Sequence, residues 1–424
     1  MSNTLTLRSS RRWLGALAIG AVLLSAALLA ACSPTPSPAS IEGPPVRAAT
    51  PQGDRVMLLT SQWRSFKSPG RGLNRTTYTD LLMDVWGFDA ATGQPVWRRR
   101  IAEDRSGVNM GREILGAQNG VLWVLQPTGL LGLSTTDGSI VGDSARIEAA
   151  NPALKGLMPT EAQYYTFDAG GLRFTAADGR KWRMTSQLLR AVADTSAPEK
   201  PAPGIALRAR VAGGNATWAF MVQGLNTQGL WLGLLSPEQA AELKDARVPR
   251  GIDPANHPRT RLWFAKIGAR DTFFGRERVY SGFAPYPESP EFLQAGLLTD
   301  NRINALPIML LKPDSVLILH RDRLGDQGRW QLTRISGPRG KVLWTARLPM
   351  QGVEAVMPGE TSIVLTGRRD EDSLKRHAND RPESVDQLVA IDYATGKAAG
   401  YSFLISSTKA EDIPPSPAYP AKTD

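Results

Sequence analysis

Cysteine is almost absent from this chain: Cys32 is the only one among 424 residues. Without a second cysteine the chain cannot form an internal disulfide, a cysteine-rich zinc site or a catalytic thiol pair. Histidine is nearly as rare, with only His257, His320 and His377. Neither the Gly-x-Ser-x-Gly turn of serine hydrolases nor the His-Glu-x-x-His motif of zinc proteases occurs. These absences exclude the most familiar hydrolytic and metal-dependent sites.

Two weaker candidates for chemistry remain in the sequence. His320 follows an apolar run, and Asp322 or Asp326 could orient it as a general base. A histidine at a strand end with charged neighbours is, however, typical of a solvated surface position. The acidic stretches at 322–326 and 370–372 lack the spacing of a known calcium loop. The sequence therefore predicts no catalytic residue, no metal site and no cofactor.

No block of like charge dominates the sequence, although its formal net charge is +10. The excess of Lys and Arg is spread along the chain, and the only tight basic run is Arg98-Arg99-Arg100. No basic stretch alternates with aromatic residues, as binding to single-stranded nucleic acid requires. The pattern predicts a solvated basic face and no nucleic-acid partner.

The N-terminus has the layout of an export signal. Arg8, Arg11 and Arg12 precede a run from 13 to 31 that contains no charged side chain. The run ends in Leu-Ala-Ala immediately before Cys32. A positive region, an apolar region and small residues at the end are the secretory pattern. The alternative is a membrane anchor, since roughly 20 apolar residues span a bilayer.

This segment resembles a bacterial lipoprotein signal, in which the cysteine is diacylated and becomes the new N-terminus. The resemblance implies that residues 1–31 are a signal peptide and that a lipid on Cys32 holds the protein on a membrane. Ser33 stands where an aspartate marks retention in the inner membrane of many Gram-negative bacteria. The expected location is therefore the outer membrane, with the protein facing the periplasm.

Proline marks the expected ends of the folded domain. Residues 33–53 contain six prolines and few large apolar groups, so we expect 32–53 to be the lipidated cysteine and an extended tether. The domain is expected over 54–408 and a Pro-rich disordered tail over 409–424. Surface loops are expected at 194–204 and 368–386.

Between these ends the apolar runs are short and separated by turn residues, as in all-β proteins. The clearest runs are residues 56–60, 81–88, 121–125, 316–319 and 363–365. Short helical insertions are expected at 236–243, where Ser236 and Pro237 suit a helix start, and at Ser289.

One turn motif recurs along the chain. The first clear copy contains Asp89, Thr92 and Gly93 and is followed by Trp97. The second contains Asp392, Thr395 and Gly396. Weaker copies centre on Gly138, Gly179 and Gly340, and Trp344 follows the last of these. In such a turn the Asp accepts backbone hydrogen bonds and the Gly takes a positive φ. The first three glycines are 45 and 41 residues apart, the repeat length of four-stranded propeller blades. We therefore predict a β-propeller of about seven blades, with six to eight as the range.

The motif resembles the blade ends of quinoprotein-like propellers, which carry pyrroloquinoline-quinone-type repeats of the form Ala-x-Asp-x-x-Thr-Gly-x-x-x-Trp. The resemblance implies that the motif residues join one blade to the next and that none of them binds a cofactor. Alcohol-oxidising members place an adjacent cysteine pair over the quinone, which this chain lacks. Among quinone-free members the chain is distantly similar to the propeller lipoproteins of the outer-membrane β-barrel assembly machinery.

These expectations favour a non-catalytic, membrane-anchored propeller that binds a protein of the cell envelope. The alternative is an envelope hydrolase or lyase with its site at the mouth of the propeller channel. Apolar or aromatic grooves on a face would favour the first function, and titratable residues clustered at the channel mouth would favour the second.

Overall fold

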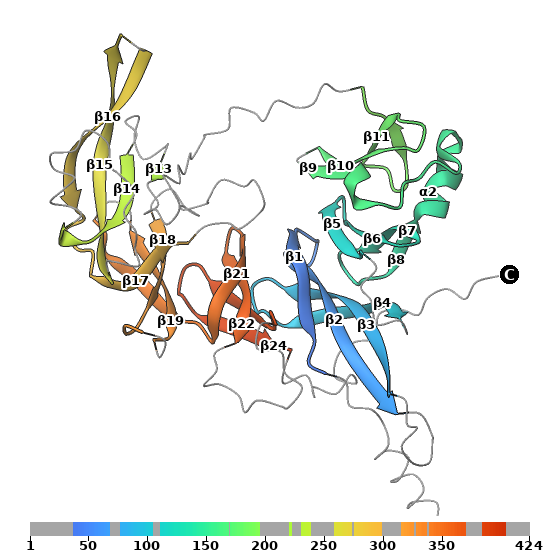
Figure 1. Ribbon diagram of the computed structural model, residues 1–424, viewed down its shortest axis with the longest axis horizontal. Helices are drawn as coiled ribbons and strands as arrows, with labels where there is room; N and C mark the ends of the chain where they lie inside the picture. The colour runs from blue at the N-terminus through green and yellow to red at the C-terminus, as the bar shows by residue number, and fades with distance from the viewer. Residues whose placement is uncertain are drawn as a thin grey trace, which may run out of the picture.

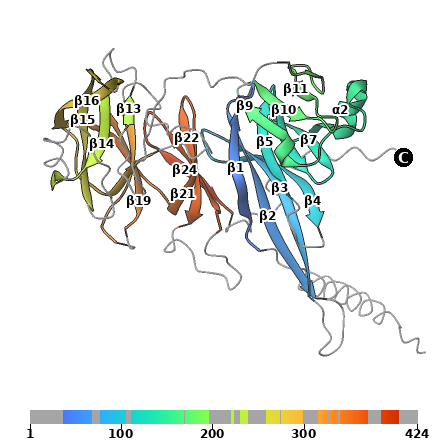
Figure 2. The same ribbon diagram turned by 45° about the horizontal axis from the view of Figure 1, so that its top comes forward.

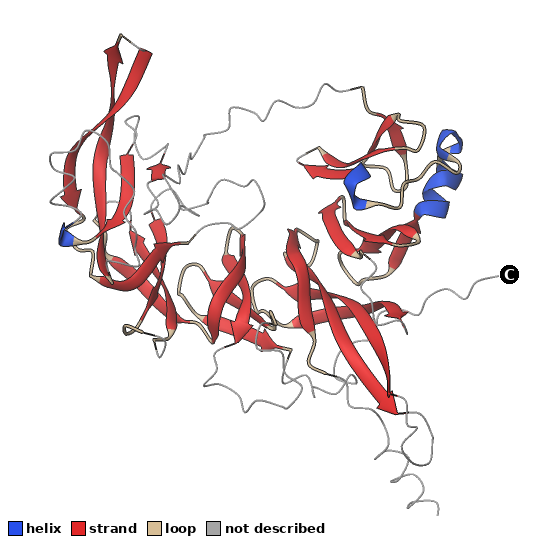
Figure 3. Cartoon of the chain, viewed as in Figure 1, coloured by secondary structure: helices blue, strands red, loops and turns tan. Residues whose placement is uncertain are grey.

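The computed structural model describes residues 37–67, 77–104, 111–168, 170–195, 220–222, 230–238, 258–273, 275–298, 315–325, 328–336, 339–369 and 384–403. Within these ranges the chain is mainly β-structure with few helical segments (Figure 3). The all-β prediction is confirmed. The segments 1–36 and 404–424, with Cys32, the signal and the tail, lie outside the described residues, as do His257 and His377.

Consecutive strands pair antiparallel into four-stranded sheets, which we call blades A to F in chain order. Blade A consists of β1 (Ser40–Ala48), β2 (Arg55–Lys67), β3 (Thr77–Asp89) and β4 (Pro95–Asp104). Blade B consists of β5 (Glu113–Gln118), β6 (Val121–Gln126), β7 (Gly129–Ser134) and β8 (Ile140–Asp143). Blade C consists of β9 (Tyr165–Asp168), β10 (Gly171–Thr175), β11 (Lys181–Met184) and β12 (Ala191–Ala193).

The second half of the chain repeats the arrangement. Blade D consists of β13 (Phe220–Val222), β14 (Leu230–Leu235), β15 (Arg259–Thr272) and β16 (Gly275–Pro285). Blade E consists of β17 (Phe292–Leu297), β18 (Ser315–Arg321), β19 (Trp330–Ser336) and β20 (Val342–Arg347). Blade F consists of β21 (Met350–Pro358), β22 (Ser362–Arg369), β23 (Gln387–Asp392) and β24 (Ala398–Ser402). A short pairing of β15 with β17 joins the sheets of blades D and E. The described residues thus form six blades, within the predicted range.

Apolar side chains fill the space between neighbouring blades, as the alternation of faces along each strand requires. Separate core clusters lie between blades C and B, B and A, A and F, F and E, and E and D. The blades therefore follow one another in the order C, B, A, F, E, D, which is visible as an arc in Figure 1. The first and last blades of the chain are neighbours in this arc, which is how the ring of a propeller closes.

The expected tether at 32–53 is wrong for its second half, because β1 occupies Ser40–Ala48 and is the first strand of blade A. Ile41 is buried against blade F, and its amide donates to the carbonyl of Val385 (2.7 Å). The prolines are accommodated at an irregularity between Glu42 and Val46, where the register with β2 shifts. An edge strand tolerates proline at such a bulge, so proline content did not exclude a strand here.

The helical expectations are only partly met. Pro237 and Glu238 are helical, and residues 239–243 of the expected helix lie outside the described residues. No helix forms at Ser289; this residue ends a turn, and its hydroxyl accepts from the amide of Leu262 (3.3 Å). An unexpected helix, α2 (Ser144–Ala150), follows β8, capped by Asp143, whose carboxylate accepts from the amide of Arg146 (2.8 Å). The two short 3-10 helices η1 (Pro152–Leu154) and η2 (Ala162–Tyr164) follow it.

Candidate functional site: the turns that join the blades

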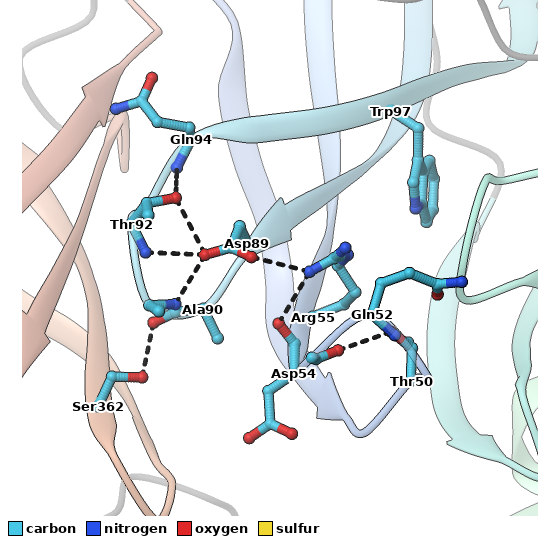
Figure 4. Close-up of polar contacts among 12 residues, drawn as sticks. Thr50, Gln52, Asp54, Arg55, Asp89, Ala90, Thr92, Gln94, Trp97 and Ser362 are labelled. Atoms are coloured by element: carbon cyan, nitrogen blue, oxygen red, sulfur yellow. Dashed lines mark hydrogen bonds and ion pairs between the residues drawn. The ribbon is translucent and has the colours of Figure 1, made fainter.

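The turn between β3 and β4 is organised by Asp89 (Figure 4). One oxygen of its carboxylate accepts from the amides of Ala91 (3.1 Å) and Thr92 (2.9 Å) and from the hydroxyl of Thr92 (3.0 Å). The other oxygen pairs with the guanidinium of Arg55 (2.9 Å). Burial acts to raise the pKa of Asp89, but these hydrogen bonds and the Arg55 charge outweigh it, so the pKa lies below its ordinary value. The carboxylate is therefore an ionised structural acceptor rather than a proton carrier.

The other turns have related geometry. In the β23–β24 turn the carboxylate of Asp392 accepts from the amide and the hydroxyl of Thr395 (2.7 Å each). These two bonds lower the pKa of Asp392. The turn glycines all have positive φ, where a side chain is strained: Gly93 (67°), Gly138 (70°), Gly179 (82°), Gly340 (75°) and Gly396 (73°).

One turn differs from the rest. The amides of Gly93, Gly138, Gly340 and Gly396 each donate to the carbonyl four residues earlier. The amide of Gly179 instead donates to the carbonyl of Ala176, three residues earlier (2.8 Å). The turn of blade C is therefore one residue tighter than the other four.

Trp97 connects blade A to blade B. It lies on β4, is almost fully buried, and its indole nitrogen donates to the carbonyl of Thr135 in the β7–β8 turn (3.2 Å). Its ring covers Gly138 of the same turn so closely that a Cβ there would lie 2.5 Å from a ring carbon. The glycine is thus required twice, for its backbone conformation and for the close approach of the indole.

Trp344 repeats this contact between blades E and F. From β20 its indole nitrogen donates to the carbonyl of Tyr393 in the β23–β24 turn (2.9 Å), and its ring covers Gly396. We call each contact of a tryptophan with the turn of the next blade an aromatic lock. In both locks the carbonyl that accepts from the indole is three residues before the glycine that the ring covers. Between blades D and E the corresponding turn glycine, Gly340, is covered by Tyr286 instead.

The junction between the last blade and the first lacks this aromatic lock. The position eight residues after the turn Asp, which is Trp97 in blade A, is Gly400 in blade F. Arg47 of β1 takes over: it pairs with Asp54 (2.8 Å) and donates to the carbonyl (2.9 Å) and hydroxyl (3.1 Å) of Ser362 on β22. The hydroxyl of Ser362 in turn donates to the carbonyl of Ala90 (2.6 Å), beside the Asp89 turn (Figure 4).

Aromatic rings fill the core of the same junction. Trp86 and Phe88 of β3 lie within 6 Å of Tyr401 and Phe403, between ring centroids. Edge-on and tilted contacts of this kind add to the stabilisation from burial alone. Neither Arg47 nor this cluster was found from the sequence. The sequence signal that could have indicated them is Gly400, which stands where the motif has its tryptophan and so shows that this junction needs other contacts.

His320 is buried, so the expectation of a solvated histidine is wrong. It lies on β18 with 8% of its surface exposed, and its ring packs against Phe292. Nε2 hydrogen-bonds the hydroxyl of Thr333 (2.7 Å), and Nδ1 lies 3.1 Å from the carbonyl of Arg321. Asp322 does not orient the ring, because both ring nitrogens have other partners and its carboxylate accepts from the amide of Arg329 (2.8 Å); Asp326 lies outside the described residues. Burial lowers the pKa of His320, which favours the neutral ring.

The basic run is largely neutralised within blade A. Arg98 and Arg100 both pair with Asp84 on the neighbouring strand, at 2.6 and 2.5 Å. Arg98 also stacks over the ring of Trp86 (4.9 Å). Arg99 points to the opposite face of the strand and is buried. The run is an internal ion-pair network and not an open basic patch.

Among the described residues no group of three or more His, Cys, Asp or Glu side chains is placed to hold a metal ion. Of the two acidic stretches that lack calcium-loop spacing, 370–372 and the last residue of 322–326 lie outside the described ranges. The described helices include none that is long and apolar enough to cross a membrane.

Comparison with known proteins does not identify a family for this chain. No protein-family model and no curated protein sequence matches the chain. Among solved structures, BamB from Moraxella catarrhalis is 11% identical, with 87% of this chain and 97% of BamB covered and a TM-score of 0.17. A xylan β-1,4-xylosidase from Bacillus halodurans is 9% identical, with 88% and 90% covered and a TM-score of 0.12. At these scores neither structure carries an argument about function, and the fold rests on the sheets of the chain itself.

Proposed function

We propose that this chain is a lipid-anchored propeller of the bacterial envelope, which binds a protein partner and serves as an accessory subunit. The observation that supports the proposal is the way its polar groups are used. The turn carboxylates shape the turns within their own blades, and Arg47 and the motif tryptophans hold one blade against the next. Such a frame presents loops and strand edges on a fixed support, as binding propellers do.

The sequence before the first strand supports the anchor. A charge-free run ends at Cys32, and a diacylated cysteine gives stable attachment where a single acyl chain does not. Mass spectrometry of the protein from membranes should find a diacylglyceryl group on Cys32. Cys32→Ser should leave an unacylated precursor, and an unmodified Cys32 in the mature protein would refute the anchor.

The scaffold itself is tested by stoichiometric co-purification. Acylated protein solubilised from membranes should retain one envelope protein in constant ratio through two chromatographic steps. Arg47→Met, which loosens the first–last junction, should reduce this ratio, while an exposed change far from it, Lys181→Gln, should not. Turnover of a small substrate that is lost in His320→Ala would overturn the scaffold in favour of an enzyme.

A further inference from the structure

The last strand of each blade lies at the end of its sheet, where no other described strand pairs with one of its edges. Contacts of β1 with β5 and β21 place the first strands on the inside of the arc, so the last strands lie on its outer side (Figure 1). Figure 2 shows blade E, labelled by β19, between the strands of blade D and those of blade F. A free edge can pair with another chain, so proteins usually interrupt it with charges or keep it short.

Four of the six outer strands show such protection. β4 and β16 are interrupted by charged residues, at 98–100 and 276–278. β8 and β12 are only four and three residues long. A fifth outer strand, β24, is uncharged, but its exposed residues are the small Ala398 and Gly400.

The outer strand of blade E, β20, exposes large apolar side chains. Val342 and Leu343 have 37% and 45% of their surface exposed, and residues 342–346 carry no charge. Leu343 stands three residues after the turn glycine, a position occupied by Val96 in blade A and Val141 in blade B. Both valines are partly buried against the neighbouring blade. The exposure is therefore a property of blade E and not of the repeat.

The backbone of the same strand is directed so that it can pair with a further strand. The amide of Leu348 donates to the carbonyl of Trp330 on β19 (2.9 Å), and the direction of backbone groups alternates along an antiparallel strand. Thr345 and Arg347 therefore direct their amide and carbonyl groups away from β19. The hydroxyls of Thr333 and Thr345 are 2.8 Å apart, which agrees with the close side chains of a pair without backbone hydrogen bonds.

The inward side chains of β20 hold the strand in place. Trp344, Ala346 and Leu348 are buried between blades E and F, and Trp344 forms the aromatic lock with the β23–β24 turn. Binding is weakened by every group that must be ordered on association. Because β20 is already fixed, only the incoming segment has to be ordered.

The side chains around the edge indicate the chemistry of that segment. Lys341 and Arg347 are exposed at the two ends of β20, and the strand contains no acidic residue. Carboxylates complement these two cations, and apolar side chains complement Val342 and Leu343. In strand addition the main chain supplies the affinity and alternate side chains supply the specificity.

We propose that the outer edge of β20 binds an extended segment of the protein partner, in which apolar residues are flanked by acidic residues. The segment pairs with the outward backbone groups of Thr345 and Arg347 and adds a strand to blade E. This inference rests on the proposed scaffold function for the existence of the partner, but the edge can be tested with a peptide alone.

The first experiment uses a fluorescein-labelled peptide, Asp-Val-Thr-Val-Thr-Val-Asp, and follows its anisotropy as the purified protein is added. This peptide should bind. N-methylation of its internal amides should abolish binding, because the methylated peptide cannot donate main-chain hydrogen bonds. Lysine in place of both aspartates should weaken binding about tenfold, because two exposed ion pairs are lost. Equal binding of the three peptides, or no binding of the first, would overturn the proposal.

Variants of the edge test the same contact from the side of the protein. Thr345→Pro removes the outward amide without removing a hydrogen bond to β19, a position where an edge strand tolerates proline. Thr345→Val removes the same hydroxyl and keeps the amide, so it should bind the peptide and Thr345→Pro should not. Leu343→Ser should weaken binding about tenfold, whereas Leu188→Ser, which removes an exposed leucine from blade C, should have no effect. Equal binding by the two Thr345 variants would overturn the proposal, and the N-methylated peptide makes this test on the unaltered protein if Thr345→Pro does not fold.

The second experiment applies the two Thr345 variants to the complex purified from membranes. The envelope protein that the parent retains should be retained by Thr345→Val and lost from Thr345→Pro. Its retention by both variants would refute the edge contact and leave the scaffold function intact. Failure of the parent to retain any envelope protein would refute the scaffold function, while the peptide experiment still decides whether the edge binds a strand.

Discussion

The contact between Trp97 and Gly138 allows the strength of a blade junction to be measured against an internal control. Gly138→Ala places a methyl group 2.5 Å from the indole ring, at a φ of 70°. Gly179→Ala places one at a similar φ, 82°, but nothing lies within 4 Å of it. The backbone strain of about 1–2 kcal/mol is therefore common to both variants. Only Gly138→Ala adds the cost of overpacking, about 1–3 kcal/mol.

Urea denaturation followed by tryptophan fluorescence measures the difference. Gly138→Ala should lower the free energy of unfolding by about 1–3 kcal/mol more than Gly179→Ala, with an unchanged dependence on urea. Combining Gly138→Ala with Trp97→Ala should cancel this excess, because the ring that the methyl group meets is gone. Equal destabilisation by the two glycine variants would show that the indole does not lock blade A to blade B.

Three further outcomes follow from the geometry. Trp344→Phe should lower the free energy of unfolding by about 1–2 kcal/mol, because the carbonyl of Tyr393 loses the indole donor. Trp182 is equally buried but its indole nitrogen has no hydrogen-bond partner, so the same cost in Trp182→Phe would contradict a role for this hydrogen bond. Arg47→Met should cost about 2–4 kcal/mol in urea denaturation and expose blade A to limited proteolysis before blade C, whereas uniform cleavage would argue against a junction held by this arginine. The unfolding free energy should fall as the pH is lowered below 6.5, since burial lowers the pKa of His320 and the unfolded chain then binds the proton more readily. His320→Gln should flatten this fall, which urea titrations at pH 7.5 and 5.5 would detect.

The turn motif is the feature of the sequence from which the propeller fold could be predicted. Asp, Thr and Gly have fixed local roles in a turn, so their spacing is readable without knowing what packs above them. Predictions made from local sequence alone were wrong where contacts with distant residues determine the secondary structure. Proline content argued for a tether at 40–48, but burial of Ile41 against blade F makes that segment a strand.

The polar contacts of the first–last junction could not be inferred from neighbours in sequence. Arg47 and Ser362 are 315 positions apart, and nothing in the residues around either predicts the other. His320 was misjudged for a similar reason. The sequence shows only its charged neighbours Arg321 and Asp322, whereas its ring contacts Phe292 and Thr333 from other strands.

The adjacency of blades A and F has a consequence for how the protein is made. A polypeptide is synthesised from its N-terminus, so blade A is complete long before blade F exists. Until β22 to β24 arrive, the face of blade A that carries Trp86 and Phe88 has no covering, and Arg47 has no carbonyl to bind. Contacts between residues so far apart in sequence form slowly. Until they form, the apolar face of blade A is exposed and prone to aggregation. Blade A is therefore the first blade to be synthesised and the last to be completely buried, and its face toward blade F is the surface that a holding chaperone would need to cover.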